Sequence, residues 1–379
     1  MNVGILTYHR AHNYGAFLQA YALCSRLNDE PDISCEIIDF RTRAEAVFYS
    51  LNRIPKRRRI LHPIYCSFRR DEYHAFEKAQ NEIAHLKTDQ AITSDSLDEF
   101  SCMVRNRYDV IIAGSDEIWK VDGFRGFPTP YWLIGDLGCR KFAYAASARV
   151  DFRKLPPEKF RILKSAIDDF EFIGVRDTKT EASVQAVADD GTKVHLCCDP
   201  SFLYDFEVPQ MPMADVLRGK ARLDPDRKTI VLMANTKALA DAVRANFSRE
   251  YNLISVFDFH PGFINAGNLS PMEWMRVIKN ADLMITTYFH GTCFSIIFGT
   301  PFVSFGSSYR SSKVEELFES GDPLSDRFIP DTDACLAGKD FRSEVLKRMK
   351  RYDNTQYIIK QRESFSVFLE ALRKNGSCK

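Results

Sequence analysis

The strongest candidate for a catalytic residue in this sequence is a histidine in a long uncharged stretch. No Asp, Glu, Lys or Arg occurs from Leu283 to Tyr309, and within this stretch His290 is followed by Gly291 and Thr292. An imidazole titrates near neutral pH, so a histidine beside a substrate can act as a general acid and base. A small residue and a hydroxyl after it suit the start of a helix, where backbone N–H groups bind anions. The alternative, a hydrogen-bonded core histidine, stays open on this pattern alone.

An arginine at the end of another apolar run is the second candidate. Arg176 follows the strand-like segment 170–175 and stands beside Asp177. Its guanidinium could hold a carboxylate or a phosphate with two parallel hydrogen bonds. A surface salt bridge is the alternative.

Polar residues after the strand-like segment 108–115 could bind a sugar. Asp116 could accept hydrogen bonds from sugar hydroxyls, with Ser115 beside it and Trp119 as an apolar platform. The alternative is that Ser115 or Asp116 caps the following helix.

The first strand-like segment, 2–8, is followed by Asn13, Tyr14 and Gly15 at the start of a helical pattern. A glycine at this turn would let the backbone approach a ligand, and the helix start would favour an anion. The alternative is a tight turn whose polar residues bind no ligand.

The segment 53–70 is basic although the whole chain is nearly neutral. Apolar residues alternate with its cations, so it could dock to an anionic membrane surface or a lipid diphosphate, at about 1 kcal/mol per basic side chain. A solvated loop is the alternative. The cations are Arg53, Lys56, Arg57, Arg58, Arg59, Arg69 and Arg70.

The elements that must position these residues alternate between strands and helices. This alternation predicts an α/β protein with mainly parallel sheets, in which ligands bind beyond the carboxyl ends of the strands. The uncharged stretch is long enough to span a bilayer, but its glycines and Pro301 divide it into strand, helix and strand. Strands are expected at 2–8, 35–40, 108–115, 141–147, 170–175, 193–200, 228–234, 251–257, 281–287 and 301–305, and helices at 15–27, 71–86, 290–299 and 357–372.

The length and composition limit the domain number and the functional class. A chain of 379 residues exceeds one ordinary core, and the segment 206–227 is rich in proline and charge. It is the predicted linker between an N-terminal domain, 1–205, and a C-terminal domain, 228–379. With 52 basic and 51 acidic residues the net charge is +1, which gives no reason to expect nucleic acid as a partner.

Several cofactor and metal motifs do not occur in the sequence. The ten cysteines include no C-x-x-C pair, and no G-x-G-x-x-G follows a strand. We therefore expect no metal and no dinucleotide cofactor. The apolar run at the N-terminus is shorter than a signal-peptide core, and the cysteines read as reduced thiols, so a cytoplasmic location is expected.

Five segments, in this order, resemble the polysaccharide pyruvyl transferase family. They are GILTYHRAHNYGAFLQAYAL, YDVIIAGSDEIW, GVRD, CDPSFL and TTYFHGTCFSIIFGTPFVSF, and the resemblance runs from Val3 to about Phe305. It implies a GT-B-like fold, with two Rossmann-like domains, an interdomain cleft and the acceptor on the N-terminal side. It also implies transfer of a pyruvyl group from phosphoenolpyruvate, as co-substrate, to a saccharide, usually as a cyclic ketal.

The resemblance also assigns roles to single residues. His290 matches a histidine proposed to act in catalysis, and Arg176 matches a strand-end arginine that helps to hold phosphoenolpyruvate. Some relatives have an arginine two residues before the histidine, where this chain has Tyr288. We expect Arg310 or Lys313 to supply the missing charge, with Gly291 and Thr292 completing the donor site.

The basic segment would suit a polyprenyl-diphosphate-linked glycan as acceptor, at the inner face of the plasma membrane, in surface or capsular polysaccharide biosynthesis. Two other functions remain open on the sequence. A GT-B glycosyltransferase would bind a nucleotide sugar at the same helix starts. A non-catalytic two-domain protein that binds saccharide or phosphate would not need His290 as a proton donor.

Overall fold

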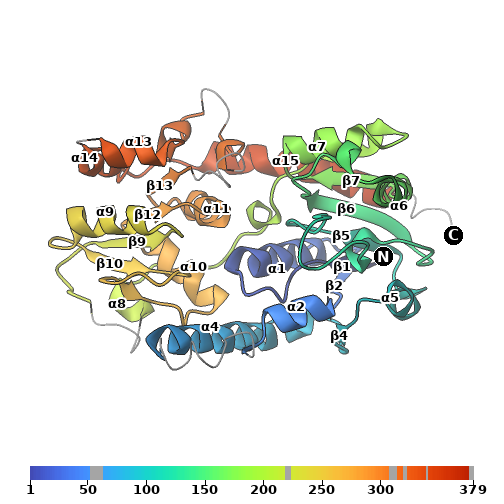
Figure 1. Ribbon diagram of the computed structural model, residues 1–379, viewed down its shortest axis with the longest axis horizontal. Helices are drawn as coiled ribbons and strands as arrows, with labels where there is room; N and C mark the ends of the chain where they lie inside the picture. Colours follow the sequence, from blue (N-terminus) through green and yellow to red (C-terminus); the bar gives the residue numbers. More distant parts are fainter. Residues whose placement is uncertain (52–62, 218–222, 307–313, 319–321, 339, 375–379) are drawn as a thin grey trace. The chain divides into compact units, whose positions relative to one another are not determined.

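The computed structural model describes residues 1–51, 63–217, 223–306, 314–318, 322–338 and 340–374 (Figure 1). The chain divides into two compact units. Unit 1 consists of Met1–Arg53, Gln80–Asp205 and Tyr357–Lys379, and unit 2 consists of Ile54–Ala79 and Phe206–Gln356. The predicted boundaries followed sequence position alone. In the structure, Ile54–Ala79 belongs to unit 2 although it lies in the N-terminal part of the chain, and Tyr357–Lys379 belongs to unit 1 although it lies at the C-terminus.

Unit 1 contains a six-stranded sheet in the order β2-β1-β5-β6-β7-β8, with every pair parallel. Buried runs such as VIIA in β5 and FIGV in β7 are typical of parallel strands covered on both faces. A separate parallel pair consists of β3 (Phe40–Arg41) and β4 (Ile92–Thr93). The six strands are β1 (Asn2–Leu6), β2 (Ser34–Ile37), β5 (Val110–Ala113), β6 (Arg140–Ala146), β7 (Phe172–Val175) and β8 (Val194–Leu196).

Alternate residues of unit 1 strands pack against different helices. In β6, Ala143 belongs to the same core as Leu163 of α6, whereas the ring of Tyr144 lies 4.8 Å from that of Phe368 in α15. This alternation follows from the two-residue period of a strand. The helices are α1 (Tyr14–Asn28), α2 (Arg43–Phe48), α5 (Leu97–Val104), α6 (Pro157–Asp168), α7 (Thr178–Gln185) and most of α15 (Thr355–Arg373).

Unit 2 repeats this design with a parallel sheet in the order β11-β10-β9-β12-β13-β14. Leu283 and Ile285 of β12 share a core with α9 and α14. The residues between and after them, Met284 and Thr286, therefore face the other side, where α11 packs. The strands are β9 (Thr229–Met233), β10 (Asn252–Ser255), β11 (Ile264–Asn265), β12 (Leu283–Thr286), β13 (Phe302–Phe305) and β14 (Phe328–Ile329).

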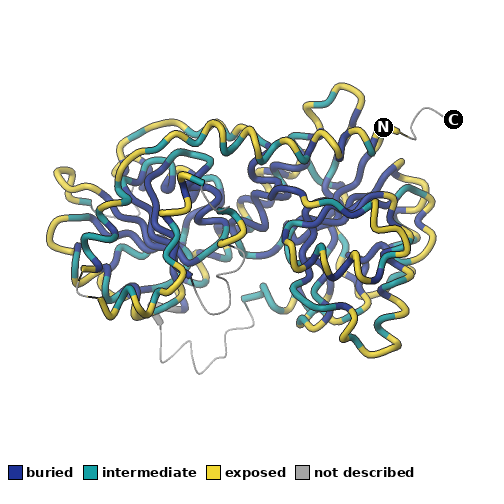
Figure 2. The backbone as a smooth tube through the Cα atoms, turned by 90° about the horizontal axis from the view of Figure 1, so that it is seen from above, coloured by how far each residue is buried: buried dark blue, intermediate teal, exposed yellow. Residues whose placement is uncertain are grey.

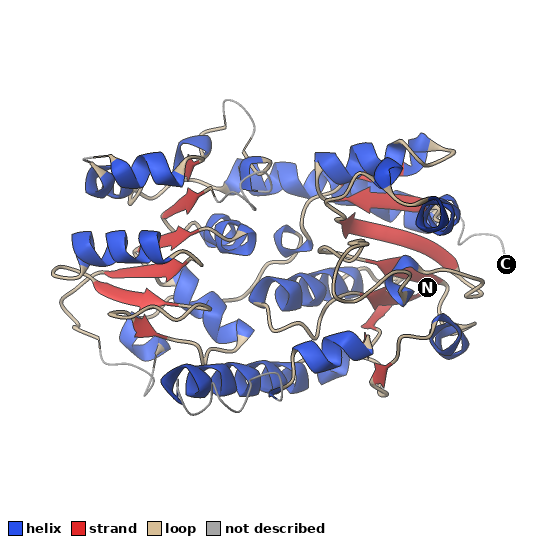
Figure 3. Ribbon diagram, viewed as in Figure 1, coloured by secondary structure: helices blue, strands red, loops and turns tan. Residues whose placement is uncertain are grey.

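The helices of unit 2 come from both of its segments. They are α4 (Pro63–Glu82, to Ala79 in this unit), α8 (Met213–Val216), α9 (Lys237–Phe247), α10 (Pro271–Lys279), α11 (Phe289–Phe298), α13 (Thr332–Ala337) and α14 (Phe341–Lys347). The predicted linker, 206–227, is part of this unit and includes α8. Figure 3 shows helices beside the strands of each sheet, and Figure 2 shows that buried residues concentrate along those strands.

The long uncharged stretch forms β12, α11 and β13, which confirms the predicted strand-helix-strand unit. Among the described residues, no helix combines the length and the apolar character needed to cross a membrane.

Candidate active site

His290 is the second residue of α11 and lies just beyond the carboxyl end of β12, an inner strand of the unit 2 sheet. It is 8% exposed. The turn before it is held by Thr286, whose Oγ1 accepts a hydrogen bond of 2.9 Å from the Tyr288 N–H. The structure thus places the predicted catalytic histidine at a strand-to-helix junction, as the sequence indicates.

The two residues after His290 fix α11 against the sheet. A Cβ atom on Gly291 would lie 2.4 Å from Thr286 Oγ1, so only glycine permits this close approach. Thr292 is fully buried, and its hydroxyl contacts Ser304 of β13 and the Tyr288 carbonyl. The prediction that the Thr292 side chain binds the donor is therefore wrong. A contact of the donor with the backbone at Gly291 stays a prediction.

Tyr288 is the N-cap residue of α11, but its side chain makes no capping hydrogen bond. Its phenol instead donates to Asp258 Oδ2 over 2.7 Å, and the ring packs edge-on against Phe257. At the position where some relatives of the resembled family have an arginine, this chain therefore has a tyrosine bound to a carboxylate. Arg310 and Lys313, predicted to supply the missing charge, lie outside the described residues.

Sequence reasoning missed three polar residues at this edge of the sheet. Asp258 follows β10, and Asn235 follows β9, where its Oδ1 accepts a 3.4 Å hydrogen bond from the Thr287 hydroxyl. His260 is buried, and its Nε2 donates to the Ala234 carbonyl over 2.7 Å. Because β10, β9 and β12 are neighbours, the residues that follow them meet at one edge, and this rule could have identified them.

A glutamate of α4 adds a titratable group to unit 2. Glu72 is 2% exposed and forms an ion pair of 2.5 Å with Arg69. Burial raises the pKa of Glu72 to about 7, the positive charge of Arg69 opposes this rise, and the negative charge of Asp258 adds to it. A carboxyl pKa raised by burial and by the charge of a second carboxylate is the kind of perturbation that is common at functional sites.

Unit 1 brings together two of the predicted site residues. Arg176 lies after β7, where its Nη1 donates to Asp199 Oδ2 over 2.6 Å and its Nη2 donates to Asp116 Oδ1 over 3.2 Å. The Arg176 side chain is 5% exposed, and that of Asp116 is 17% exposed. Burial alone would lower the pKa of this guanidinium, but the carboxylates of Asp199 and Asp116 raise it above its ordinary value. Arg176 is thus a buried ion-pair partner.

Two predicted sugar contacts beside Asp116 are wrong. Trp119 is fully buried, and its ring stacks on Trp132 with the centroids 5.2 Å apart. It therefore offers no platform to a ligand. Ser115 is also fully buried, and its backbone N–H donates to Gln19 Oε1 over 3.2 Å. Asp116 itself has a φ of 82°, a left-handed conformation that is uncommon for aspartate and is often found at functional sites.

At the start of α1 the structure supports the tight-turn alternative. Asn13 caps the helix, and its Oδ1 accepts hydrogen bonds from the N–H groups of Gly15 (3.0 Å) and Ala16 (3.3 Å). Tyr14 is fully buried, so the prediction that its side chain binds an acceptor is wrong. Binding by Asn13 and the backbone of Gly15 stays a prediction.

A second buried ion-pair cluster lies at the ends of β1 and β2. Asp39 accepts hydrogen bonds from Arg10 (Nη2 to Oδ2, 2.6 Å) and interacts with His9 (Nε2 to Oδ1, 3.0 Å) and with Lys87. Burial alone would raise the pKa of Asp39, but His9 and Arg10 hold it well below its usual range. The sequence did not identify this cluster.

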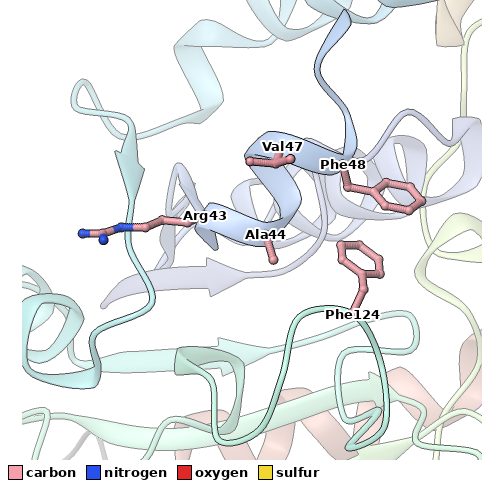
Figure 4. A pocket seen from close by; sticks show the side chains of 5 residues that line it. All are labelled: Arg43, Ala44, Val47, Phe48 and Phe124. Atoms are coloured by element: carbon pink, nitrogen blue, oxygen red, sulfur yellow. The ribbon is translucent and has the colours of Figure 1, made fainter. Parts of the chain in front are cut away.

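Most of the predicted basic patch lies outside the described residues, namely Arg53, Lys56, Arg57, Arg58 and Arg59. Of its other members, Arg69 pairs with Glu72 and Arg70 is exposed. Residues of α2, which precedes this segment, and Phe124, which follows it, line an open apolar pocket of about 450 Å³ (Figure 4). In it Phe48 of α2 stacks on Phe124 at 4.3 Å, Val47 is 68% exposed, and Arg43 points away from the two rings.

Comparison with solved structures shows the fold. UDP-GlcNAc 2-epimerase from Neisseria meningitidis bound to UDP-GlcNAc is 10% identical, with a TM-score of 0.54 over 99% of this chain and 100% of that chain. UDP-N-acetylglucosamine 2-epimerase from Rickettsia bellii is 8% identical, with a TM-score of 0.51 over 99% and 96%. These likenesses confirm the predicted α/β, GT-B-like fold, with two parallel six-stranded sheets.

No curated protein matches the chain. The sequence pattern of one family, described as polysaccharide pyruvyl transferase, matches residues 13–309. This match covers most of the chain, and it includes Asp116 and Arg176 of unit 1 and His290 of unit 2. The chain therefore belongs to the polysaccharide pyruvyl transferase family.

Proposed function

We propose that the protein transfers the pyruvyl group of phosphoenolpyruvate to a saccharide as a cyclic ketal and releases phosphate. Family membership supports the reaction class. The observation that carries the proposal is the place of His290, at the start of α11 and beyond the carboxyl end of β12. Ligands of parallel sheets bind at this edge, and a helix start stabilises the negative charges of such a donor.

In the proposed reaction, His290 donates a proton to the methylene carbon of phosphoenolpyruvate, which becomes a methyl group. A hydroxyl of the acceptor forms a C–O bond at the adjacent carbon and returns its proton to the imidazole. A second hydroxyl closes the ketal as the bond from this carbon to the phosphate oxygen breaks, and its proton leaves with the phosphate. General acid–base catalysis of this kind contributes roughly 100- to 10,000-fold.

The contacts of unit 1 support an acceptor role for Asp116. Its carboxylate is partly exposed and is held by Arg176, so it can accept a hydrogen bond from a sugar hydroxyl in a fixed direction. Arg176 then serves to orient Asp116. A direct contact between Arg176 and phosphoenolpyruvate is less favourable, because the anion would meet two carboxylates there. Arg310 and Lys313 keep their proposed role as counter-charges of the donor.

The proposed acceptor is a lipid-linked glycan intermediate of surface polysaccharide biosynthesis, used at the cytoplasmic face of the membrane. Two features support this part of the proposal. Five cations occur from Arg53 to Arg59, and Val47 and Phe48, which line the exposed apolar pocket together with Phe124, come just before them in the chain. Cations suit the diphosphate and anionic headgroups, and the apolar pocket suits a hydrocarbon chain.

The test is phosphate release from phosphoenolpyruvate by the wild type, by His290→Gln and by a control variant, His85→Gln. His85 is an exposed histidine of unit 1. Each is assayed with no acceptor, with water-soluble saccharides and with lipid-linked saccharides. We expect acceptor-dependent release that is lost only in His290→Gln. Unchanged turnover in His290→Gln would contradict the mechanism.

Two other results would point to other functions. Turnover of a nucleotide sugar, without binding of phosphoenolpyruvate, would show a glycosyltransferase. Binding of phosphoenolpyruvate or saccharide that never leads to turnover, equal in wild type and His290→Gln, would show a binding protein. For the lipid part, Val47→Asp is expected to weaken use of lipid-linked acceptors and to leave soluble acceptors unaffected; equal use of both would contradict it.

A further inference from the structure

The first turn of α11 determines where the His290 imidazole points. His290 is the second residue of the helix, so its direction depends on Tyr288, the N-cap residue. The backbone of Tyr288 is fixed on both sides. Its N–H donates to Thr286 Oγ1 over 2.9 Å, and its carbonyl accepts from the Thr292 N–H over 3.2 Å.

The side chain of Tyr288 is fixed as well, by an acid on a neighbouring loop. The 2.7 Å bond from its phenol to Asp258 Oδ2 has a charged acceptor, and such hydrogen bonds are about twice as strong as neutral ones. Because this side chain does not cap its own helix, its main directional contact lies outside α11.

Asp258 is itself held firmly. Its carbonyl accepts a 2.6 Å hydrogen bond from the hydroxyl of Ser255, which is fully buried. The residue before it, Phe257, has a φ of 77°, which a phenylalanine adopts only when its surroundings enforce it. The hydrogen bond and the enforced conformation of Phe257 thus fix the backbone from which the Asp258 carboxylate extends.

Helix α4 of the same unit packs against the loop that contains Asp258. Phe68 of α4 packs edge-on against Phe259 with the ring centroids 5.8 Å apart, and a Cβ on Gly267 would lie 2.0 Å from the Phe68 ring. Glu72, one helical turn further along α4, has a pKa that responds to the charge of Asp258. The carboxylate that holds Tyr288 thus lies in a packed environment.

We propose that Asp258 is a positioning residue for His290: its carboxylate holds the Tyr288 phenol, and this bond fixes the first turn of α11 and the direction of the imidazole. The inference rests on the proposed function only for what His290 does, since its position can be measured without turnover.

The kinetic test is a double-mutant cycle with Tyr288→Phe, Asp258→Asn and the double variant. Tyr288→Phe removes the donor of this hydrogen bond and is expected to lower kcat for phosphate release about tenfold to a hundredfold, whereas Asp258→Asn replaces its charged acceptor by a weaker neutral one and is expected to lower kcat by less. KM for phosphoenolpyruvate is expected to stay within about twofold, because positioning acts on the reacting state more than on binding. The double variant is expected to match the slower single variant, because the bond can be lost only once.

A tyrosine at the other end of the same helix provides the matched control. The Tyr352 hydroxyl donates to the carbonyls of Ser295 (2.8 Å) and Thr300 (3.2 Å) at the C-terminal end of α11. Tyr352→Phe is expected to lower the stability of the fold while kcat stays at the wild-type value. Unchanged kcat in Tyr288→Phe, or effects of the two single changes that multiply in the double variant, would overturn the proposal.

A second measurement separates this proposal from the proposed function. If the wild type releases no phosphate, the proposed function fails, and the His290 ring is then followed by NMR, with His290→Gln assigning its signals. We expect those signals to shift or broaden in Tyr288→Phe and Asp258→Asn but not in Tyr352→Phe. Signals identical to those of the wild type in Tyr288→Phe would overturn the positioning role. Tyr288→Phe also covers the case in which Asp258→Asn does not fold.

Discussion

The carboxyl ends of the strands are charged in both units, but the charges are arranged differently. In unit 1 three acids face cations: Asp116 and Asp199 share Arg176, and Asp39 faces Arg10 and Lys87. In unit 2 Glu72 also pairs with a cation, Arg69, but burial raises the pKa of Glu72 to about 7 and the negative charge of Asp258 adds to this rise.

The two arrangements have different consequences. Paired charges keep one protonation state over a wide pH range and hold side chains in one direction, which suits the recognition of a substrate. The raised pKa of Glu72 keeps a proton on this carboxyl group up to about neutral pH, which suits a site of proton transfer. Four amino-acid substitutions test this difference, in order of decreasing expected effect.

The largest effect is expected for Arg176→Met, which leaves two buried carboxylates without their cation. We expect a loss of about 3 to 5 kcal/mol in the free energy of unfolding, measured with urea at pH 7. Arg105→Met is the control, because Arg105 pairs with Asp136 on the surface over 2.8 Å and both side chains are exposed. That change is expected to cost at most about 1 kcal/mol. Equal losses would show that the Arg176 network does not stabilise unit 1.

Asp39→Asn tests the second ion-pair cluster of unit 1. The pKa of Asp39 is lower in the folded than in the unfolded state, so its contribution is present above the unfolded value and is lost as the pH falls. At pH 7 we expect the variant to be less stable by about 2 to 3 kcal/mol, and this deficit to shrink below about pH 4. Urea unfolding from pH 3 to pH 8 measures it, with exposed Asp89→Asn as control. A deficit independent of pH would contradict the paired-charge interpretation.

Glu72→Gln should show the opposite pH dependence. The pKa of Glu72 is raised from 4.5 to about 7, so in this window the folded state binds more protons than the unfolded state. The wild type therefore loses stability as the pH rises, and glutamine does not share this loss. Relative to the wild type, we expect the variant to gain about 2 kcal/mol between pH 5 and pH 8. Asp71→Asn, at the exposed neighbouring position, should show no such gain.

The smallest effect is expected for Tyr352→Phe, at the opposite end of α11 from His290. Losing the hydrogen bonds to the Ser295 and Thr300 carbonyls should cost about 1 kcal/mol in unfolding free energy. Urea unfolding compares it with Tyr288→Phe. If Tyr352→Phe lowered the free energy of unfolding as much as Arg176→Met does, the comparison would fail. Single hydrogen bonds would then stabilise unit 2 as strongly as ion pairs stabilise unit 1.

The sequence predicted the elements well because periodicity is a local property. Strands such as β5 and β12 are continuous apolar runs, and α1 shows helical spacing, so the α/β alternation could be seen without tertiary information. The position of His290 after a strand was predicted for the same reason. The six-residue α2 and the short α8 have too few residues for a clear period and were missed.

The ion-pair networks could not be predicted from local patterns. Arg176 is 60 residues from Asp116 and 23 from Asp199, so only the strand order brings them together. Trp119 looked like a ligand platform because it follows a strand end, but Trp132, later in the same connection between β5 and β6, covers its ring. In both cases the missing information was the identity of the neighbour in space.

The place of α15 in the chain has a consequence for protein synthesis. Phe365 and Phe368 of α15 pack against Tyr144, and Arg140 donates to the Leu372 carbonyl, 232 residues later in the chain. At roughly 5 to 20 residues per second, a ribosome needs on the order of 10 to 50 seconds to make that interval. During this time the aromatic face of β6 lacks its cover, so the nascent chain presents a site for chaperones until α15 has emerged.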